Sequence, residues 1–404
     1  MCLLYRNPHH IYDVVRPLLA FSKVFGQTAF RIVGEPPYVQ IKVSRIECVA
    51  LLMNFVGNCF CAYINISNSR LSRFTGSTVM DKGLSFLFPL GAIIMALLAI
   101  DNFLRRNITC TILAQLFAVD RSLQRKNLGL NHRRQYVVLV RLLYVLVGFI
   151  AFGTLFSLGM AAISEFSLLN HMINGFSYAY TGVQFLIVNF HFVATARLVT
   201  YRLEVIKRSI KKHFESGSWW IEQKQRWGRR MEPIDVVAEL AGDFATLTRI
   251  VERANRIYSN QIVGLISGVL MFSIFVIYAC SYSYYVGSIH EFRLTFILLT
   301  AWMFYILMVG FIFFSGMGVR NTSNAVVDLL HEALQQENDV SIKRKLACFS
   351  QQILLQQPRL RCIFYDYNWK TLFSMFGLVV TYLVILLQFD KISDRSSNEN
   401  PLSA

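Results

Sequence analysis

Long apolar runs dominate the pattern of positions along the chain. Seven runs are about as long as the roughly 20 residues that a helix needs to cross a bilayer core, and none contains Asp, Glu, Lys or Arg. The pattern therefore predicts an all-α membrane protein with seven transmembrane helices. They cover residues 48–66, 83–100, 142–163, 172–196, 261–289, 294–319 and 371–389.

In the long gaps between these runs, apolar residues also recur at helical spacing. Residues 197–214 and 234–260 carry apolar side chains on one face, and so do 325–336 and 341–357. The first three stretches continue the fourth, fifth and sixth spans, whereas 215–233 holds Gly and Trp residues and is typical of a loop. Because apolar stripes need each other for burial, the pattern predicts a packed helical anchor domain outside the membrane. The alternative is that each stripe lies on the lipid surface.

Composition supports a membrane protein. Hydrophobic residues make up 54% of the 404 residues and charged residues only 16%, where soluble proteins have roughly 25% charged residues. The net charge of +16 is distributed unevenly, because 34 of the 40 Lys and Arg residues fall in the N-terminal segment and the three long gaps. Positive loops face the cytoplasm, so the N-terminus is predicted to be cytoplasmic and the C-terminus extracellular. The basic balance then reflects topology and does not indicate nucleic-acid binding.

Several classes fit poorly with these patterns. A G-protein-coupled receptor has the opposite orientation and usually carries prolines in its spans, whereas here only Pro89 falls within one. A transporter often uses a carboxylate inside the membrane, and no predicted span has one. The eight cysteines lack zinc spacing, and no nucleophile–base or metal constellation indicates an enzyme, so neither a cofactor nor a metal is expected.

The end of the last span carries the most specific signal. It has Thr381-Tyr382, five apolar residues, and then Gln388-Phe389, with Gly377 shortly before. This resembles the C-terminal signature of the insect gustatory receptors. Ser350-Gln351-Gln352-Ile353-Leu354 and the N-terminal stretches Ile11-Tyr12-Asp13, Arg16-Pro17-Leu18-Leu19 and Lys23-Val24-Phe25-Gly26 also resemble that family. Asn368 departs from it, since an acidic residue is expected at the start of the last span.

The resemblance implies a function and an assembly. Insect gustatory receptors are ligand-gated cation channels in the plasma membrane of chemosensory neurons, with four subunits around one pore lined by the seventh span. The expected partners are a small-molecule tastant, cations, lipid and three further receptor subunits, identical or different. The alternatives are metabotropic signalling from the same topology and, less favoured, transport. The implied division is an N-terminal segment (1–47), a ligand-binding bundle (48–319, including the extensions 197–260), an anchor (320–370), a pore helix (371–389) and an extracellular tail (390–404).

The last span is suited to form the wall of a pore. At 100° per residue, its polar and bulky positions share a broad face on which Gln388 would form a ring of amides and Ile385 and Phe389 apolar constrictions. Asp390, directly after the span, would add carboxylates at the outer mouth. The alternative to a pore role is that Gln388 and Tyr382 pack against neighbouring helices. For Asp390 the alternative is that it only marks the solvated end of the helix. The predicted pore residues are Thr381, Tyr382, Ile385, Gln388, Phe389 and Asp390.

The ligand site is predicted from depth in the membrane. Aromatic side chains with a few amides and hydroxyls, as in a small-molecule pocket, occupy the outer halves of the third to sixth spans. The alternative is an interfacial aromatic belt or helix packing. The zone has no carboxylate, which favours a bitter or other non-sugar compound. The predicted ligand residues are Phe156, Tyr178, Gln184, Tyr278, Tyr282, Trp302 and Tyr305.

Overall fold

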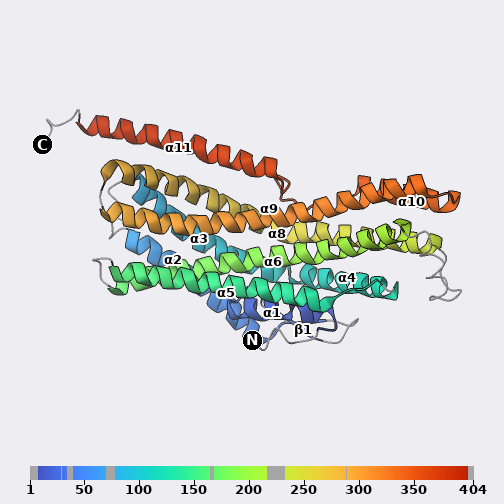
Figure 1. The fold of residues 1–404 in the computed structure, drawn as a ribbon. Helices are drawn as coiled ribbons and strands as arrows, with labels where there is room; N and C mark the ends of the chain where they lie inside the picture. Colours follow the sequence, from blue (N-terminus) through green and yellow to red (C-terminus); the bar gives the residue numbers. More distant parts are fainter. Residues whose placement is uncertain are drawn as a thin grey trace.

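The protein is an elongated bundle of helices (Figure 1). The computed structural model describes residues 8–28, 30–33, 40–69, 78–126, 128–163, 168–215, 233–287 and 289–398. Its elements are α1 (Ile11–Val24), β1 (Arg31–Val33), β2 (Gln40–Lys42), α2 (Arg45–Ser69), α3 (Thr78–Leu104), α4 (Arg106–Arg125), α5 (His132–Ile163), α6 (Leu168–Glu215), α8 (Pro233–Val286), α9 (Ile289–Gln336), α10 (Val340–Leu355) and α11 (Trp369–Asn398).

Three helices are far longer than a membrane is thick. Helices α6 and α9 have 48 residues each and α8 has 54. At a rise of 1.5 Å per residue they are about 70–80 Å long, whereas the hydrocarbon core is about 30 Å. The predicted continuation of the fourth, fifth and sixth spans as unbroken helices is therefore confirmed. The predicted loop between α6 and α8 lies mostly outside the described residues.

Six helices in the described part of the chain are long and apolar enough to cross a membrane. They are α2, α3, α6, α8, α9 and α11. Five of them contain a predicted span in full, whereas the predicted fifth span (261–289) runs past the end of α8 at Val286, because the chain turns at Gly287 (φ 65°). The remaining predicted span, 142–163, lies within the 32-residue α5.

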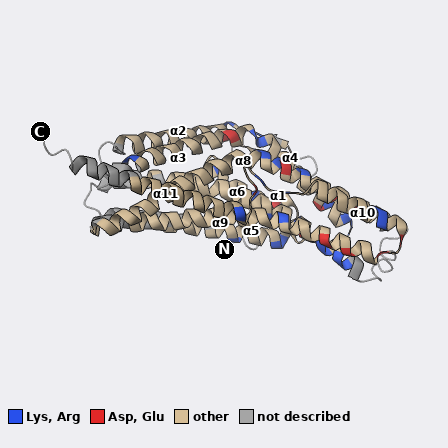
Figure 2. Ribbon diagram, turned by 90° about the horizontal axis from the view of Figure 1, so that it is seen from above, with Lys and Arg blue, Asp and Glu red and all other residues tan. Residues whose placement is uncertain are grey.

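Helices α4 and α10 pack beside the extended ends of the long helices. In α10, Ile342, Leu346, Phe349 and Ile353 are buried at helical spacing against α8 and α9, as the apolar stripe predicted. Leu354, the fifth residue of that stripe, is 53% exposed, because it lies 100° beyond Ile353 around the helix. Asp339 caps the start of α10, because its side chain accepts a hydrogen bond from the Ser341 amide (2.8 Å). Figure 2 shows Lys, Arg, Asp and Glu gathered at this end of the bundle.

Two ion pairs fix α4 within this region. Arg202 of α6 and Asp120 of α4 form a bidentate pair (2.8 and 2.7 Å), and their side chains are 0% and 3% exposed. Lys126, at the end of α4, donates to Asp243 of α8 (2.6 Å). Hydrogen-bonded ion pairs form only at one relative position of two helices, whereas apolar contacts allow small shifts. The two pairs therefore specify the position of α4 along α6 and along α8.

The N-terminal segment contains one helix and two short strands. Helix α1 packs on α4 and α5, and β1 and β2 form an antiparallel pair with Ile32 opposite Ile41. Between α1 and β1 the chain turns at Gly26 (φ 65°), where a Cβ atom would lie 2.5 Å from the Ala50 oxygen of α2. Only glycine tolerates both this conformation and this approach without strain.

Candidate ligand and pore sites

Helix α11 lies at the surface of the bundle (Figure 1) and has two different faces. One face contacts the rest of the chain. Val379 on this face is 2% exposed, and Leu372, Met375, Leu383, Leu386 and Leu387 are partly buried beside it. Only 6% of the apolar window of α11 is buried, so most of this helix is not covered by the rest of the described chain.

Two of the predicted pore residues, Thr381 and Gln388, lie on the opposite face, Ile385 lies beside that face, and Tyr382 lies at the edge of the contacting face. At 100° per residue, Thr381 and Gln388 point roughly 180° away from Val379, Ile385 roughly 120° away and Tyr382 only roughly 60° away. Tyr382 is 51% exposed and Ile385 is 38% exposed, while Thr381 and Gln388 are also exposed. The side chains of Phe389 and Asp390 lie outside the described residues. Helix α11 continues to Asn398, so the predicted tail begins as helix and not directly after residue 389.

Asn368, the departure from the family pattern, has a structural role here. Its Oδ1 accepts hydrogen bonds from the backbone amide of Thr371 (2.8 Å) and from the Thr371 hydroxyl (3.0 Å). An amide oxygen thus caps the start of α11 as a carboxylate would.

Four of the seven predicted ligand residues meet in one aromatic cluster. Tyr278 is 0% exposed and packs with Phe272 of α8 and Leu298 of α9, and Tyr282, Trp302 and Tyr305 contact this group. The rings of Tyr278 and Tyr282 stack with centroids 6.4 Å apart. Trp302 Nε1 donates a hydrogen bond to Ser273 Oγ of α8 (2.7 Å). Leu383, Leu386 and Leu387 of α11 pack against the same cluster, so the predicted ligand site touches the predicted pore helix.

Gln184 lies elsewhere, in a network of buried amides. Its Oε1 accepts hydrogen bonds from Gln27 Nε2 and Asn58 Nδ2, both at 3.0 Å. Asn102 Nδ2 donates to Gln27 Oε1 (3.2 Å), and Gln261 Nε2 donates to Asn102 Oδ1 (2.7 Å). The network joins the turn after α1 to four helices, which the sequence did not reveal. The side chains of the other two predicted ligand residues, Phe156 and Tyr178, lie outside the described residues.

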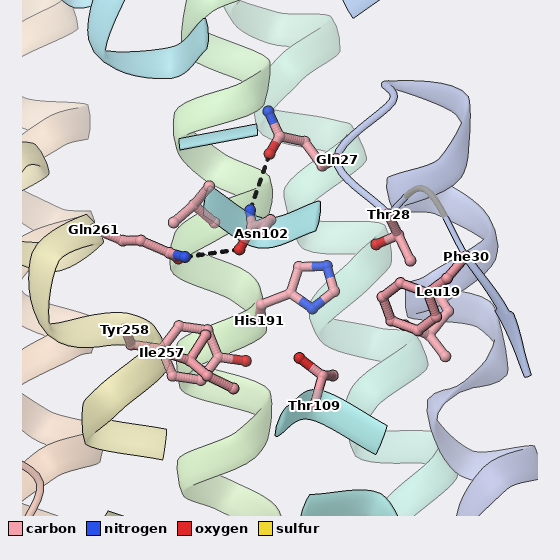
Figure 3. Close-up of a pocket in the computed structure, with 11 residues that line it drawn as sticks. Leu19, Gln27, Thr28, Phe30, Asn102, Thr109, His191, Ile257, Tyr258 and Gln261 are labelled. Atoms are coloured by element: carbon pink, nitrogen blue, oxygen red, sulfur yellow. Dashed lines mark hydrogen bonds between the residues drawn. The ribbon is translucent and has the colours of Figure 1, made fainter. Parts of the chain in front are cut away.

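A small polar cavity adjoins this network (Figure 3). Gln27, Asn102, His191 and Gln261 line it together with Thr28, Thr109, Tyr258 and apolar side chains. Its volume of about 30 Å³ suits one or two water molecules and not a tastant. His191, which also forms a hydrogen bond with Ser22 (2.5 Å), thus belongs to a packed polar interior. Among the described residues no cluster of His, Cys, Asp and Glu could hold a metal ion.

Comparison of the sequence with models of known protein families identifies the family of this chain. The family model described as "7tm Chemosensory receptor" matches residues 15–393. The chain belongs to the seven-transmembrane chemosensory receptor family. Its relatives are receptors and not enzymes. No curated protein sequence matches the chain.

Two solved structures show the same fold for this chemosensory receptor. The insect olfactory receptor OR5 from Machilis hrabei aligns over 93% of this chain and 97% of its own, with 12% identity and a TM-score of 0.63. The same receptor in complex with eugenol aligns over the same shares with 12% identity and a TM-score of 0.57. At this identity the likeness establishes the seven-helix fold. The prediction of an insect chemoreceptor fold is thereby confirmed, while the gustatory type is not decided by it.

Proposed function

We propose that this chemosensory receptor is a subunit of a gustatory, ligand-gated, non-selective cation channel. Four subunits, identical or mixed, surround one pore lined by α11 in the plasma membrane of a chemosensory neuron. The C-terminal signature at 381–389 supports the gustatory type. The cluster of Tyr278, Tyr282, Trp302 and Tyr305 binds a small-molecule tastant.

The uncovered face of α11 carries this proposal. A lipid-facing helix is apolar, yet this face presents Thr381 and the amide of Gln388 in addition to Ile385. A polar stripe on a membrane helix indicates a water-filled path or a protein partner. Rotational symmetry would bring this stripe from each subunit to a common axis, where neutral amides offer dipoles to a partly hydrated cation without selecting strongly among cations.

The aromatic cluster supports a less polar ligand. It combines ring faces with a few hydroxyls, which suits a small organic molecule. The solved structure of the related olfactory receptor includes a complex with eugenol. Since the predicted third to sixth spans contain no Asp or Glu, we favour a bitter or other non-sugar compound.

The charged end of the bundle faces the cytoplasm in this proposal. The partition of 34 against 6 basic residues supports this orientation. Residues 320–370 then form, with the extensions of α6 and α8, the anchor between subunits. The bundle 48–319 binds ligand, 371–389 lines the pore and 390–404 is extracellular. An epitope tag at the N-terminus should remain unstained on intact cells, and surface staining would contradict the orientation.

Excised inside-out patches test the channel directly. An active tastant is first selected by a calcium-imaging screen of cells expressing the chain. We expect this tastant to evoke cation current in excised patches without nucleotides, because pore and ligand site share one assembly. A current that requires a G protein would refute the channel and support metabotropic signalling instead.

A further inference from the structure

The link between α10 and α11 runs along α8 in a defined conformation. Residues 356–368 are not helical, and an isolated bridge joins Arg361 to Asp366. The Cys362 amide donates to the Tyr365 oxygen (3.0 Å), which closes a tight turn. This segment is the covalent connection between the anchor helices and the proposed pore helix.

A single side chain of α8 holds the backbone of this linker at two points. Asn255 Nδ2 donates a hydrogen bond to the Arg359 oxygen (2.9 Å), and Asn255 Oδ1 accepts one from the Arg361 amide (3.0 Å). An amide side chain provides one donor and one acceptor side by side, and so imitates the edge of a β-strand. Leu360, between the two bonded residues, is 4% exposed and anchors the linker in the core.

The end of the linker is fixed as well. The Tyr367 ring is 2% exposed and packs edge-on against Phe192 of α6 (5.3 Å between centroids) and Phe313 of α9 (5.7 Å). Burial raises the pKa of the Tyr367 hydroxyl, which stays protonated. Asn368, the next residue, caps α11. The place where α11 starts is therefore set by contacts of the linker with α6, α8 and α9.

Helix α8 contacts the linker near its middle and the proposed pore helix near its C-terminal end. Near its far end, Phe272 and Tyr278 belong to the aromatic cluster on which Leu383 and Leu386 of α11 pack. Asn255 lies 23 residues before Tyr278 in the same unbroken helix, about 35 Å away. Since an unbroken helix can carry coupling between distant sites, we expect a shift at the cluster to displace Asn255 as well.

We propose that Asn255 is a positioning residue that couples the aromatic cluster to the pore: α8 transmits movement of the cluster, and the two Asn255 hydrogen bonds pass it to the linker and the start of α11. The proposal rests on the channel function proposed above. Without the bonds, α8 moves past the linker and α11 keeps its position.

A double-mutant cycle on open probability tests the coupling without any ligand. Unliganded openings are recorded from single channels in excised patches for the original chain, Asn255→Ala, Trp302→Phe and the double variant. Trp302→Phe removes the hydrogen bond from the cluster to Ser273 of α8. We expect each single change to alter open probability about threefold to tenfold, the range for one or two lost hydrogen bonds. In the Asn255→Ala background the effect of Trp302→Phe should fall by about threefold or more.

Two further variants separate coupling from stability. Thr248→Val is the matched control, because Thr248 lies two turns earlier on α8 and forms one long hydrogen bond to the first residue of the linker, the Gln356 oxygen (3.5 Å). It should leave open probability unchanged. Asn255→Asp keeps the acceptor for Arg361 and loses the donor, so it should lie between the original chain and Asn255→Ala.

The outcomes are distinguishable from a failure of the channel itself. If the double variant changes open probability by the product of the two single effects, the residues act independently and the coupling is refuted. An unchanged open probability in Trp302→Phe would refute it as well. If Asn255→Ala is lost from the surface, the cycle is run with Asn255→Asp, and independence there has the same meaning. Absence of any channel opening in the original chain, with ligand and without, would refute the proposed function.

Discussion

The buried pair Arg202–Asp120 gives a quantitative test of how the extended helices hold together. Asp120→Ala removes two hydrogen bonds (2.8 and 2.7 Å) from a guanidinium that is 0% exposed. Arg202 keeps the Leu198 oxygen (2.6 Å) and Gln135 Oε1 (3.4 Å), but neither carries a charge. Removing one partner of a buried pair lowers the free energy of unfolding by about 3–5 kcal/mol. Because Arg202 keeps these two contacts, we expect a loss at the lower end, about 3 kcal/mol.

The double variant Asp120→Leu with Arg202→Met shows whether Asp120→Ala destabilises the protein through an unpaired buried charge or through lost packing. It removes both charges and retains apolar volume, so its free energy of unfolding should fall by less than that of Asp120→Ala. Lys207–Glu204 is the matched exposed pair (3.9 Å), with side chains 33% and 38% exposed. Glu204→Ala should cost less than about 0.5 kcal/mol, because solvent screens this pair.

Thermal unfolding of purified protein in detergent measures these differences. For a chain of this length, Asp120→Ala should lower the midpoint by roughly 3–4 °C, and Glu204→Ala by about 1 °C or less. A double variant as unstable as Asp120→Ala would refute the argument, because the loss would then come from shape and not from an unpaired buried charge.

Further expectations concern five other positions of the receptor. Gly26→Ala should destabilise the chain by about 1–3 kcal/mol in the same thermal assay, because φ is 65° and a Cβ atom would collide with α2. Asn65 lies in a glycosylation sequon, but its side chain is only 7% exposed, so deglycosylating enzymes should not change the gel mobility of the chain. Trp302→Ala should shift tastant sensitivity by about tenfold while surface labelling is unchanged, and an unaltered dose–response curve would place the ligand elsewhere. Gln388→Ala should change relative permeability, and Asp390→Asn should lower conductance at an ionic strength of about 0.01 M more than at 0.15 M, where screening is stronger.

The helical architecture was predictable because it depends on local periodicity. Apolar side chains at helical spacing on both sides of residue 261 predicted that α8 leaves the membrane without a break, and its 54 residues do. The same reasoning predicted the buried face of α10 and the uncovered face of α11. The pairing of β1 with β2 was not predictable, since strands of three residues leave too short a pattern.

The candidate sites were predictable only in part. Aromatic residues at similar depth in the fifth and sixth predicted spans meet in one cluster. Gln184, at similar depth in the fourth, instead joins Gln27 from the N-terminal segment, 157 residues away in the chain. An amide binds whichever polar group the fold brings within about 3 Å, so composition and depth do not identify its partner.

By itself, the sequence determined the membrane class, the helical spans, their extensions and the family signature, because each is written in neighbouring residues or in the spacing of one helix. Tertiary structure alone decided which polar groups meet: Arg202 with Asp120, Gln184 with Gln27, and Asn255 with the backbone of the linker. Hydrogen bonds are short and directional, so a displacement of one ångström abolishes them. Apolar burial tolerates such displacement because it depends on area and not on direction, which is why its pattern survives in the sequence.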